Sequence, residues 1–252
     1  MDDTSLLTLA AELARHAGQA ILDIRARGFE VIRKADASPV TAADHAAEAI
    51  IVAGLRAAVP EIPVIAEEEM ADGRITAPGP AFWLVDPLDG TKEFAAGRDE
   101  FTVNIGLIRD GRPVLGIVGV PALGEMFGGI VGQGAWKQTQ AGKTPIHVRT
   151  PPAEGLTVMA SRLHAAMPEL QAFLAGRHVA SLSNIGSSLK FCRLAEGKVD
   201  LYPRLGRTME WDTAAAQAVL EAAGGRVTLL DGTPLSYGKP GWENPHFVCI
   251  GG

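Results

Sequence analysis

Two aspartates three residues apart, Asp86 and Asp89, are the residues of this chain best suited to chemistry. They stand in the stretch WLVDPLDGTKEF, where an apolar, strand-like run leads to Asp86 and Pro87 stiffens the backbone that follows. The pair Asp89-Gly90 predicts a turn whose backbone N–H groups face an anion, directly before Thr91. Clustered carboxylate oxygens suit Mg²⁺ better than Zn²⁺, which prefers His or Cys. The stretch therefore predicts a magnesium and phosphate site, although DPLDG alone is also typical of a polar turn after a buried strand.

Two further stretches carry acidic residues in distinctive surroundings. AEEE occupies residues 66–69, and WDTAAAQAVLEAAGG occupies residues 211–225. Together with DPLDGT they resemble the three signatures of the inositol-monophosphatase-like phosphatases, which are Mg²⁺-dependent and lithium-sensitive. The resemblance spans nearly the whole chain. Ala66 departs from it, because the family more often has Gly or Ser before its glutamate pair, but a small side chain is kept.

The residues around these motifs favour one branch of the superfamily. DPLDGTKEF, EFTVNIGLI at residues 100–108 and GSSLKFCRLAEGKVDLYPR at residues 186–204 are similar to the 3'(2'),5'-bisphosphate nucleotidases of the bacterial CysQ type. Inositol and sugar phosphatases usually differ at these places. The resemblance implies a hydrolase that converts adenosine 3',5'-bisphosphate to AMP and phosphate, in sulfur assimilation or nucleotide recycling. Its partner is then a small phosphorylated nucleotide and its cofactor is Mg²⁺.

We expect an α/β fold that mixes α+β and α/β parts. The resemblance implies a layered α-β-α-β-α sandwich of the inositol monophosphatase and fructose-1,6-bisphosphatase type, with the active site between two halves. A proline pair follows Thr150, where the pattern of elements changes. We therefore predict an N-terminal α+β domain over residues 1–150, with an antiparallel sheet and most metal ligands, and a C-terminal α/β domain over residues 151–252 that completes the active site.

Hydrophobic periodicity predicts the elements that position these residues. Apolar residues recur at three- and four-residue steps over residues 5–27, and TAAD at residues 41–44 has the spacing of a capping box that opens a second helix. Apolar runs in the first half predict a mostly antiparallel sheet. These strands are expected at residues 30–33, 64–65, 82–85, 101–108, 114–120 and 126–131. In the second half we expect strands at residues 156–160, 179–183, 199–202, 226–230 and 247–250, and helices at 168–175, 187–196 and 212–223.

Length and composition exclude several classes of protein. The 252 residues can bury a substantial core in one large layered domain or two smaller ones. Apolar runs stay well short of the ~18 residues that span a bilayer, and the acidic start MDDTSLL lacks a signal-peptide core. Only Cys192 and Cys249 occur, which favours reduced thiols in the cytoplasm and leaves peripheral attachment to the inner membrane open. The net charge of -6 gives no reason to expect nucleic-acid binding. Monomer and homodimer both remain compatible with the sequence.

The resemblance assigns five metal ligands, four carboxylates and one backbone carbonyl. They are Glu67, Asp86, Asp89, Asp212 and the carbonyl of Leu88. Asp212 also has a structural interpretation, because an acidic residue in the first turn of a helix compensates the helix dipole. Glu67 stands in a run of three glutamates, which is typical of a solvated surface, although the apolar residues before it predict a strand that turns it inward. We expect Glu68 to support the site from behind and Glu69 to be exposed.

The resemblance also pairs two catalytic residues, Thr91 and Asp44, which orient and deprotonate the attacking water. Thr91 directly follows the turn glycine, so its hydroxyl can lie beside the metals. Asp44 has a competing role, because as the last residue of TAAD it can simply complete the capping box. The sequence leaves both roles open.

The predicted substrate contacts surround the same turn and the GSSLK stretch. They are Gly90, Thr91, Gly186, Ser187, Lys190, Arg204 and Asp212. Free N–H groups at the start of the helix predicted after Gly186 are suited to a phosphate or ribose oxygen, and an ordinary serine N-cap is the alternative. Lys190, Arg204 and Arg207 are candidates for a second phosphate. We also expect Tyr202 near the base and Lys34 over the metals, whereas the histidines, His164 among them, lack metal-ligand spacing.

Two other functions stay open at this point. An inositol or sugar phosphatase would use the same metal core. A non-catalytic sensor would bind the phosphorylated nucleotide and keep the fold. The intact set of carboxylates with Thr91 argues against the sensor, because a protein that has lost catalysis commonly loses at least one such group.

Overall fold

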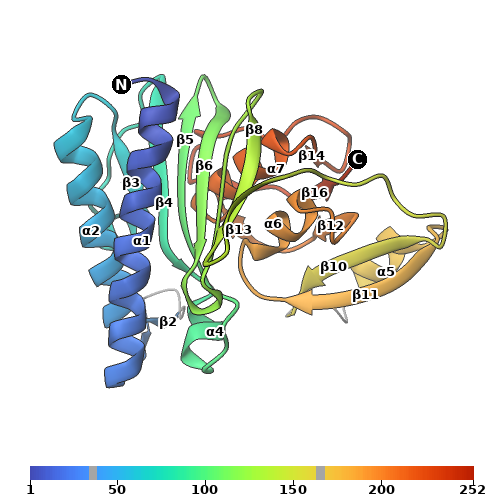
Figure 1. The fold of residues 1–252 in the computed structure, drawn as a ribbon, viewed down its shortest axis with the longest axis horizontal. Helices are drawn as coiled ribbons and strands as arrows, with labels where there is room; N and C mark the ends of the chain where they lie inside the picture. Colours follow the sequence, from blue (N-terminus) through green and yellow to red (C-terminus); the bar gives the residue numbers. More distant parts are fainter. Residues whose placement is uncertain (34–38, 163–167) are drawn as a thin grey trace.

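The computed structural model of this chain describes residues 1–33, 39–162 and 168–252. Its helices and sheets stack in five layers, with α1 and α2 outside the first sheet, α6 and α7 between the two sheets, and α5 outside the second sheet (Figure 1). The predicted α-β-α-β-α sandwich is therefore confirmed. The helices of these layers are α1 (Asp3–Arg27), α2 (Ala42–Ala58), α5 (Pro168–Leu174), α6 (Leu189–Ala195) and α7 (Ala214–Ala222).

The first sheet has seven strands in the order β3-β4-β5-β6-β7-β8-β9. Only β3 and β4 pair in parallel, and the other neighbours are antiparallel, as predicted. The last two strands were not predicted, because their short, polar, glycine-flanked segments lack an apolar run. The strands are β3 (Val64–Ala66), β4 (Ala81–Asp89), β5 (Thr102–Arg109), β6 (Arg112–Val120), β7 (Glu125–Ile130), β8 (Gly134–Thr139) and β9 (Gly142–Ile146).

The second sheet has five strands in the order β11-β10-β12-β16-β14. Strand β10 pairs in parallel with β11 and β12, whereas β16 runs antiparallel to β12 and β14. The strands are β10 (Leu156–Ser161), β11 (Val179–Ile185), β12 (Leu201–Arg204), β14 (Arg226–Leu229) and β16 (Phe247–Ile250). The two sheets thus come from separate parts of the chain, on either side of residues 147–155. The division into domains at residue 150 stays a prediction.

Short elements complete the described chain. Two small antiparallel ribbons are β1 (Ile32–Arg33) with β2 (Pro39–Val40), and β13 (Thr208–Met209) with β15 (Glu243–Asn244). Two 3-10 turns are η1 (Pro121–Leu123) and η2 (Glu210–Asp212). The predicted helix at residues 212–223 begins only at Ala214, because Asp212 ends η2 instead.

Helix α7 lies unusually close to the first sheet. A Cβ atom added to Gly116 of β6 would lie 2.1 Å from the carbonyl oxygen of Ala215, and one added to Gly106 of β5 would lie 2.7 Å from the Ala215 amide nitrogen. Glycine in the sheet and alanine in the helix therefore allow backbone to meet backbone. This approach brings the start of α7, and Asp212 before it, against the strands that carry the other acidic residues.

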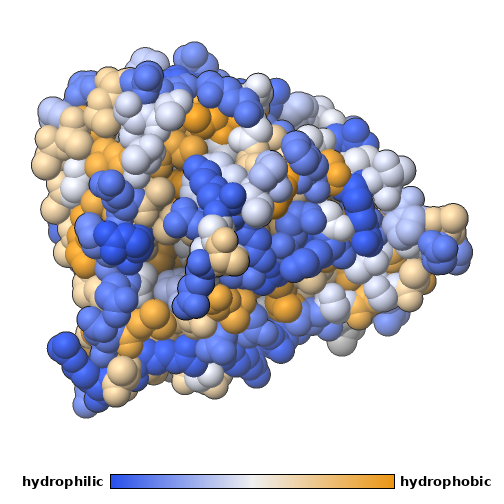
Figure 2. Space-filling view, in the orientation of Figure 1, coloured by the Kyte–Doolittle hydropathy of each residue, from blue (hydrophilic) through white to orange (hydrophobic). Residues whose placement is uncertain are grey.

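The surface seen in Figure 2 is mostly hydrophilic, with hydrophobic side chains in small separate patches. No helix among the described residues is long and apolar enough to cross a membrane. Cys192 and Cys249 are free and buried. Buried apolar residues instead fill the spaces on both sides of the first sheet, where the two main core clusters lie.

Candidate active site

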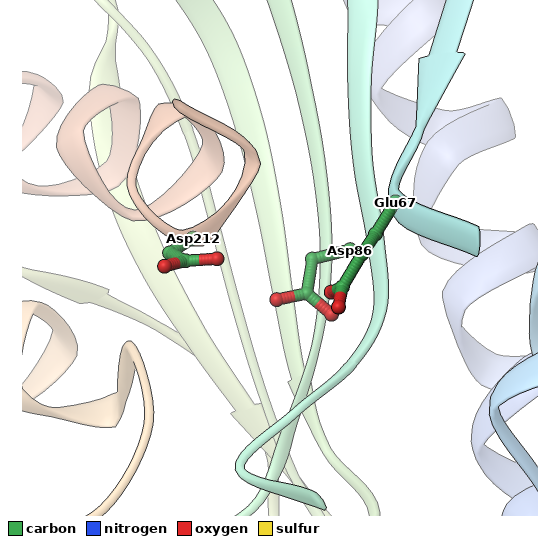
Figure 3. A group of neighbouring side chains, drawn as sticks. All are labelled: Glu67, Asp86 and Asp212. Carbon is green, nitrogen blue, oxygen red and sulfur yellow. The ribbon is translucent and has the colours of Figure 1, made fainter. Parts of the chain in front are cut away.

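Three acidic side chains from separate elements converge at one point. Ligand oxygens of Glu67, Asp86 and Asp212 all lie within 4.8 Å of one another. In Figure 3, Asp86 projects from its strand and Glu67 from the chain beside it, while Asp212 reaches toward them from the opposite side. Glu67 is the first residue of α3 (Glu67–Ala71), which follows β3 directly. Three of the four predicted carboxylate ligands thus form one group.

The charges of this group oppose one another. Burial raises the pKa of Asp86 well above its usual value, and the negative charges of Glu67, Asp89 and Asp212 raise it further. Burial also raises the pKa of Asp212, followed by the charges of Asp89 and Glu67. Ionised carboxylates this close are stable together only beside a cation. The donor set fits a divalent metal with a preference for oxygen ligands.

Asp89 lies at the end of the same strand, beyond a bulge. Asp86 pairs with Asn104 and Asp89 with Thr102, so two residues of β4 stand opposite one residue of β5. One carboxylate oxygen of Asp89 accepts the backbone N–H of Ser188 at 2.5 Å. Burial raises the pKa of Asp89 to about 6, although the positive charge of Lys190 acts in the opposite direction. Asp89 therefore lies beside the group of three and links it to the GSSLK turn.

The predicted turn after Asp89 is present. Gly90 has a φ of 94°, in the left-handed region. It packs close to the backbone of Glu100, whose carbonyl oxygen would lie 3.3 Å from an added Cβ. The turn opens the short helix α4 (Thr91–Ala95). The Leu88 carbonyl oxygen lies on the same side, 3.1 Å from the Thr91 hydroxyl oxygen, and is one of two acceptors within its reach. The structure therefore brings Leu88 and Thr91 beside the acidic group.

Asp44 completes the capping box of α2 and also lies within hydrogen-bonding distance of Thr91. Its Oδ2 accepts both the backbone N–H and the hydroxyl of Thr41, each at 2.7 Å, which completes the capping box of α2. Its Oδ1 is 3.1 Å from the Thr91 hydroxyl, which is placed to donate to it. Burial raises the pKa of Asp44. The two interpretations of Asp44 are therefore compatible, because each uses a different oxygen.

A cavity of about 270 Å³ opens over these residues. All the predicted metal ligands line it, as do the predicted substrate contacts other than Arg207, while Asp44 lies behind Thr91. The predicted residues that line the cavity are Glu67, Asp86, Leu88, Asp89, Gly90, Thr91, Gly186, Ser187, Lys190, Tyr202, Arg204 and Asp212. Arg207 is absent from the lining and forms an exposed ion pair with Glu243 instead.

The GSSLK turn forms one wall of the cavity. Ser187 has a φ of 55°, which is unusual for a residue with a side chain. The buried ammonium of Lys190 holds this turn, because it donates to the carbonyls of Ser187 at 2.5 Å and Ile185 at 3.3 Å. Gly186 has no room for a side chain, since an added Cβ would lie 2.5 Å from the Glu93 side chain. The turn is therefore held in a strained shape against the metal residues.

Ser187, rather than the serine at the N-cap position, bonds to the start of the helix, because its hydroxyl oxygen accepts the Leu189 N–H at 3.3 Å. Helix α6 begins at Leu189, and Ser188 at the N-cap position makes no side-chain capping bond. Its hydroxyl instead lies 2.9 Å from the Thr102 hydroxyl and 2.8 Å from the Asn104 side-chain oxygen, both on β5. Burial lowers the pKa of the Lys190 ammonium to about 8, and the negative charge of Asp89 partly opposes this shift. Ser188 thus ties the turn to the first sheet.

The aromatic and basic residues of β12 extend this wall, because the Lys190 ammonium lies 5.1 Å from the centroid of the Tyr202 ring. Tyr202 is buried and its ring packs edge-on against Phe191 and Phe247. The guanidinium of Arg204 donates to the carbonyls of Gly206 at 3.2 Å and Arg207 at 2.7 Å. Arg204 therefore sits at the cavity in a fixed orientation.

Some residues at the site were missed in the sequence. Lys92 and Glu93, which follow Thr91 in α4, also line the cavity. Their signal was present in DGTKEF, but a charged pair on a short helix looks like ordinary surface. Among the described residues Lys92 has no ion pair, so its charge is available to a ligand. Lys34 and His164 lie outside the described residues.

The glutamates after Glu67 depart partly from expectation. Glu68 is buried as expected, and its backbone N–H donates to Glu48 at 2.7 Å. Glu69 was expected to be exposed, which is wrong. It is buried, because the guanidinium of Arg56 from α2 binds both of its oxygens, at 2.9 and 2.7 Å.

The sequence matches the Inositol monophosphatase family over residues 2–246. This chain belongs to the inositol monophosphatase family. It is 44% identical to the 3'(2'),5'-bisphosphate nucleotidase CysQ of Escherichia coli K12, over 96% of this chain and 98% of that protein. It is 40% identical to the CysQ of Buchnera aphidicola, over 92% of this chain and 87% of that protein.

Solved structures of the inositol monophosphatase family share the fold. The crystal structure of CysQ from Bacteroides thetaiotaomicron superposes with a TM-score of 0.81 at 36% identity, covering 98% of this chain and 97% of that one. An inositol monophosphatase from Anabaena superposes with a TM-score of 0.76 at 28% identity, covering 99% of this chain and 91% of that one. The CysQ structure and the inositol monophosphatase structure thus share the architecture of this chain.

Proposed function

We propose that this protein is a 3'(2'),5'-bisphosphate nucleotidase that converts adenosine 3',5'-bisphosphate to AMP and phosphate. The observation that carries the proposal is the meeting of Glu67, Asp86 and Asp212 beside the hydrogen-bonded pair of Thr91 and Asp44. The site occurs in a chain that is 45% identical, over 96% of its length, to a nucleotidase CysQ of Escherichia coli O157:H7. The family and the site together support a phosphatase, and these relatives support the nucleotide.

The metal is Mg²⁺ in this proposal. Glu67, Asp86, Asp89 and Asp212 with the Leu88 carbonyl offer only hard oxygen atoms, which Mg²⁺ prefers. When bound, magnesium ions neutralise charge on the phosphoryl oxygens and lower the pKa of a bound water. The four carboxylates would hold the metal in place, and the backbone N–H of Ser188 fixes one oxygen of Asp89.

Thr91 and Asp44 remove a proton from the attacking water. The attacking water gives a proton to the Thr91 hydroxyl oxygen as the Thr91 hydroxyl passes its own proton to Oδ1 of Asp44, 3.1 Å away. The water oxygen forms a bond to phosphorus as the bond from phosphorus to the 3'-oxygen breaks, the 3'-oxygen takes a proton from a solvent water, and Asp44 later releases its proton to solvent. Because Oδ2 of Asp44 is held by Thr41, the carboxylate keeps Oδ1 directed at Thr91. Positioned proton transfer of this kind contributes about 10²–10⁴-fold to rate.

The walls of the cavity supply the contacts to the rest of the substrate. Gly186 and Ser187 present backbone groups from the strained turn, and Arg204 with Lys190 supplies positive charge for the second phosphate. Gly90, Thr91 and Asp212 face the phosphate that is removed. Lys92, which the cavity also includes, adds a third cation. An inositol monophosphate offers this positive charge only one phosphate, so the walls favour a bisphosphate.

The proposal is tested by metal removal and by a charge-neutral replacement. Phosphate release from adenosine 3',5'-bisphosphate is expected to stop in EDTA and to return with added Mg²⁺. Asp89→Asn is expected to lose nearly all turnover while its circular dichroism spectrum stays that of the wild type, because one carboxylate is lost from the metal site. Full activity of the wild type in the chelator would show that the mechanism is wrong.

A further inference from the structure

The carboxylate of Glu210 is the most completely enclosed acidic group near the site, and it touches none of the proposed metal ligands. It lies in η2, two residues before Asp212, and its side chain is 0% exposed. Three donors surround it: the N–H groups of Gly238 at 2.7 Å and Lys239 at 2.9 Å, and the Lys239 ammonium at 2.7 Å. A buried charge persists only when its hydrogen bonds are satisfied in this way.

These donors come from one loop, which lies between β14 and β15. At its end, the Trp242 carbonyl accepts the backbone N–H of Glu210 at 2.8 Å. Trp242 has a φ of 61°, a conformation that a bulky residue rarely adopts. The loop thus closes around Glu210 and is bound to η2 through both its side chain and its backbone.

The same loop packs on the strand that carries Asp86. The Trp242 ring meets the Phe82 ring edge-on, with 6.0 Å between the ring centroids. Phe82 lies in β4, four residues before Asp86. A continuous set of contacts therefore runs from Glu210 through Trp242 and Phe82 to the strand of Asp86.

We infer that Glu210 is a positioning residue, which fixes Asp212 relative to Asp86 for binding of the metal. The inference rests on the proposed metal site. Ligand oxygens of Asp86 and Asp212 lie within 4.8 Å of each other although the two residues come from β4 and η2, far apart in the sequence, so contacts between these elements must set the separation of their carboxylates. The loop bound to Glu210 supplies that support, because one end of it holds η2 and its tryptophan packs on β4.

A second set of contacts holds the other end of η2. Thr213 donates to the Glu210 carbonyl at 3.1 Å, and its hydroxyl lies 3.1 Å from the Tyr237 hydroxyl and 3.0 Å from the Asn244 amide nitrogen. These bonds do not involve the Glu210 carboxylate, so we expect them to persist when it is changed. Glu210→Gln is therefore expected to leave the chain folded and to loosen the position of Asp212.

The test is the direct binding of Mg²⁺ to the full chain, measured by calorimetry without substrate. Glu210→Gln is expected to weaken Mg²⁺ binding about tenfold, at the lower end of the effect of groups that orient metal ligands. Its kcat is expected to fall at limiting Mg²⁺ and to recover at high Mg²⁺. Lys239→Met, which keeps the carboxylate and both N–H donors, is expected to show a smaller loss.

The matched control is Asp200→Asn. Asp200 is also a buried carboxylate held by a cation and a backbone N–H, with Arg149 Nε at 2.8 Å and the Thr157 N–H at 2.7 Å, but it lies in the second sheet region. It is expected to lose melting temperature and to bind Mg²⁺ like the wild type. If Glu210→Gln binds Mg²⁺ as tightly as the wild type, or if Asp200→Asn weakens binding equally, the inference is overturned. If the wild type itself binds no Mg²⁺, the proposed metal site fails first and the inference fails with it.

Discussion

Replacement of Asp44 by asparagine separates the two roles of this residue. Thr41 presents two donors to Oδ2, a backbone N–H and a hydroxyl, and Thr91 presents one donor to Oδ1. An asparagine has one oxygen and one NH₂ group. The side-chain oxygen of the asparagine is expected to turn toward Thr41, because the Thr41 backbone N–H can only donate a hydrogen bond. The NH₂ group then faces Thr91, whose hydroxyl is left to donate to the Leu88 carbonyl at 3.1 Å.

The expected cost to stability is small. Hydrogen bonds to a charged group contribute about 1.5–3 kcal/mol and neutral ones about 0.5–1.5 kcal/mol, so the helix cap weakens by roughly 1 kcal/mol. Burial raises the pKa of Asp44, which means that folding disfavours its ionised form, and a neutral asparagine removes that penalty. The net change in the melting temperature is therefore expected to stay below about 4 °C.

The expected cost to activity is large, because the proton acceptor for Thr91 is gone. Asp44→Asn is expected to lower kcat by at least about 100-fold. Thr91→Ala is expected to lower it to a similar extent, and the double variant to lose less than the product of the single losses, because the two residues act as one unit.

Thr41→Ala is the matched control. It removes the capping hydroxyl at a cost of about 1 kcal/mol but leaves the backbone N–H on Oδ2 and the contact from Thr91 to Oδ1. It is expected to melt earlier and to keep most of its activity. The assay is phosphate release at saturating Mg²⁺ with parallel thermal unfolding. If Asp44→Asn keeps more than half of the wild-type kcat, or if the effects of Asp44 and Thr91 multiply strictly, Asp44 is only a helix cap.

Three further outcomes follow from packing and charge. Gly116→Ala is expected to lower the melting temperature by about 6–12 °C, because its Cβ would lie 2.1 Å from the Ala215 carbonyl oxygen. Gly119→Ala in the same strand has room for a Cβ and should change the melting temperature little. Equal shifts for the two variants would show that close packing at Gly116 is not the cause. Burial raises the pKa of Glu48 from 4.5 to about 7, so the folded state binds more protons than the unfolded state in that window. The metal-free protein should therefore unfold more easily as pH rises from about 4.5 to about 7, and Glu48→Gln should flatten that dependence; an unchanged dependence would contradict it. Arg204→Ala is expected to narrow the preference for adenosine 3',5'-bisphosphate over 3'-AMP, measured as the ratio of kcat/KM, and an unchanged ratio would remove Arg204 from the second phosphate site.

The sequence predicts the elements wherever a local pattern is sufficient. The amphipathic spacing of residues 5–27 corresponds to α1, and TAAD forms the capping box of α2. The bounds of α7 were less accurate, because the sequence cannot show that Asp212 ends a separate 3-10 turn. Strands β8 and β9 were missed because they are stabilised by pairing with their neighbours rather than by an apolar run of their own.

The site could be predicted where its motifs are contiguous. The turn at Gly90 and the strand before Asp86 follow from the local sequence, and the family resemblance supplied the remaining acidic residues. Contacts between distant segments could not be read in the same way. The exposed assignment of Glu69 failed because Arg56 reaches it from another helix, and the loop around Glu210 shows no motif at all. Arg207 likewise lies outside the cavity, where it pairs with Glu243 from a distant part of the sequence.

Hydrolysis of a nucleotide bisphosphate at this site is tested most directly by a comparison of substrates. One preparation at fixed Mg²⁺ is assayed for kcat/KM with adenosine 3',5'-bisphosphate, 3'-AMP, inositol 1-phosphate and fructose 1,6-bisphosphate. A charge-assisted contact to the second phosphate contributes about 1.5–3 kcal/mol, so adenosine 3',5'-bisphosphate is expected to exceed 3'-AMP and inositol 1-phosphate by roughly tenfold or more. Faster hydrolysis of inositol 1-phosphate or fructose 1,6-bisphosphate than of the nucleotide would contradict the assignment.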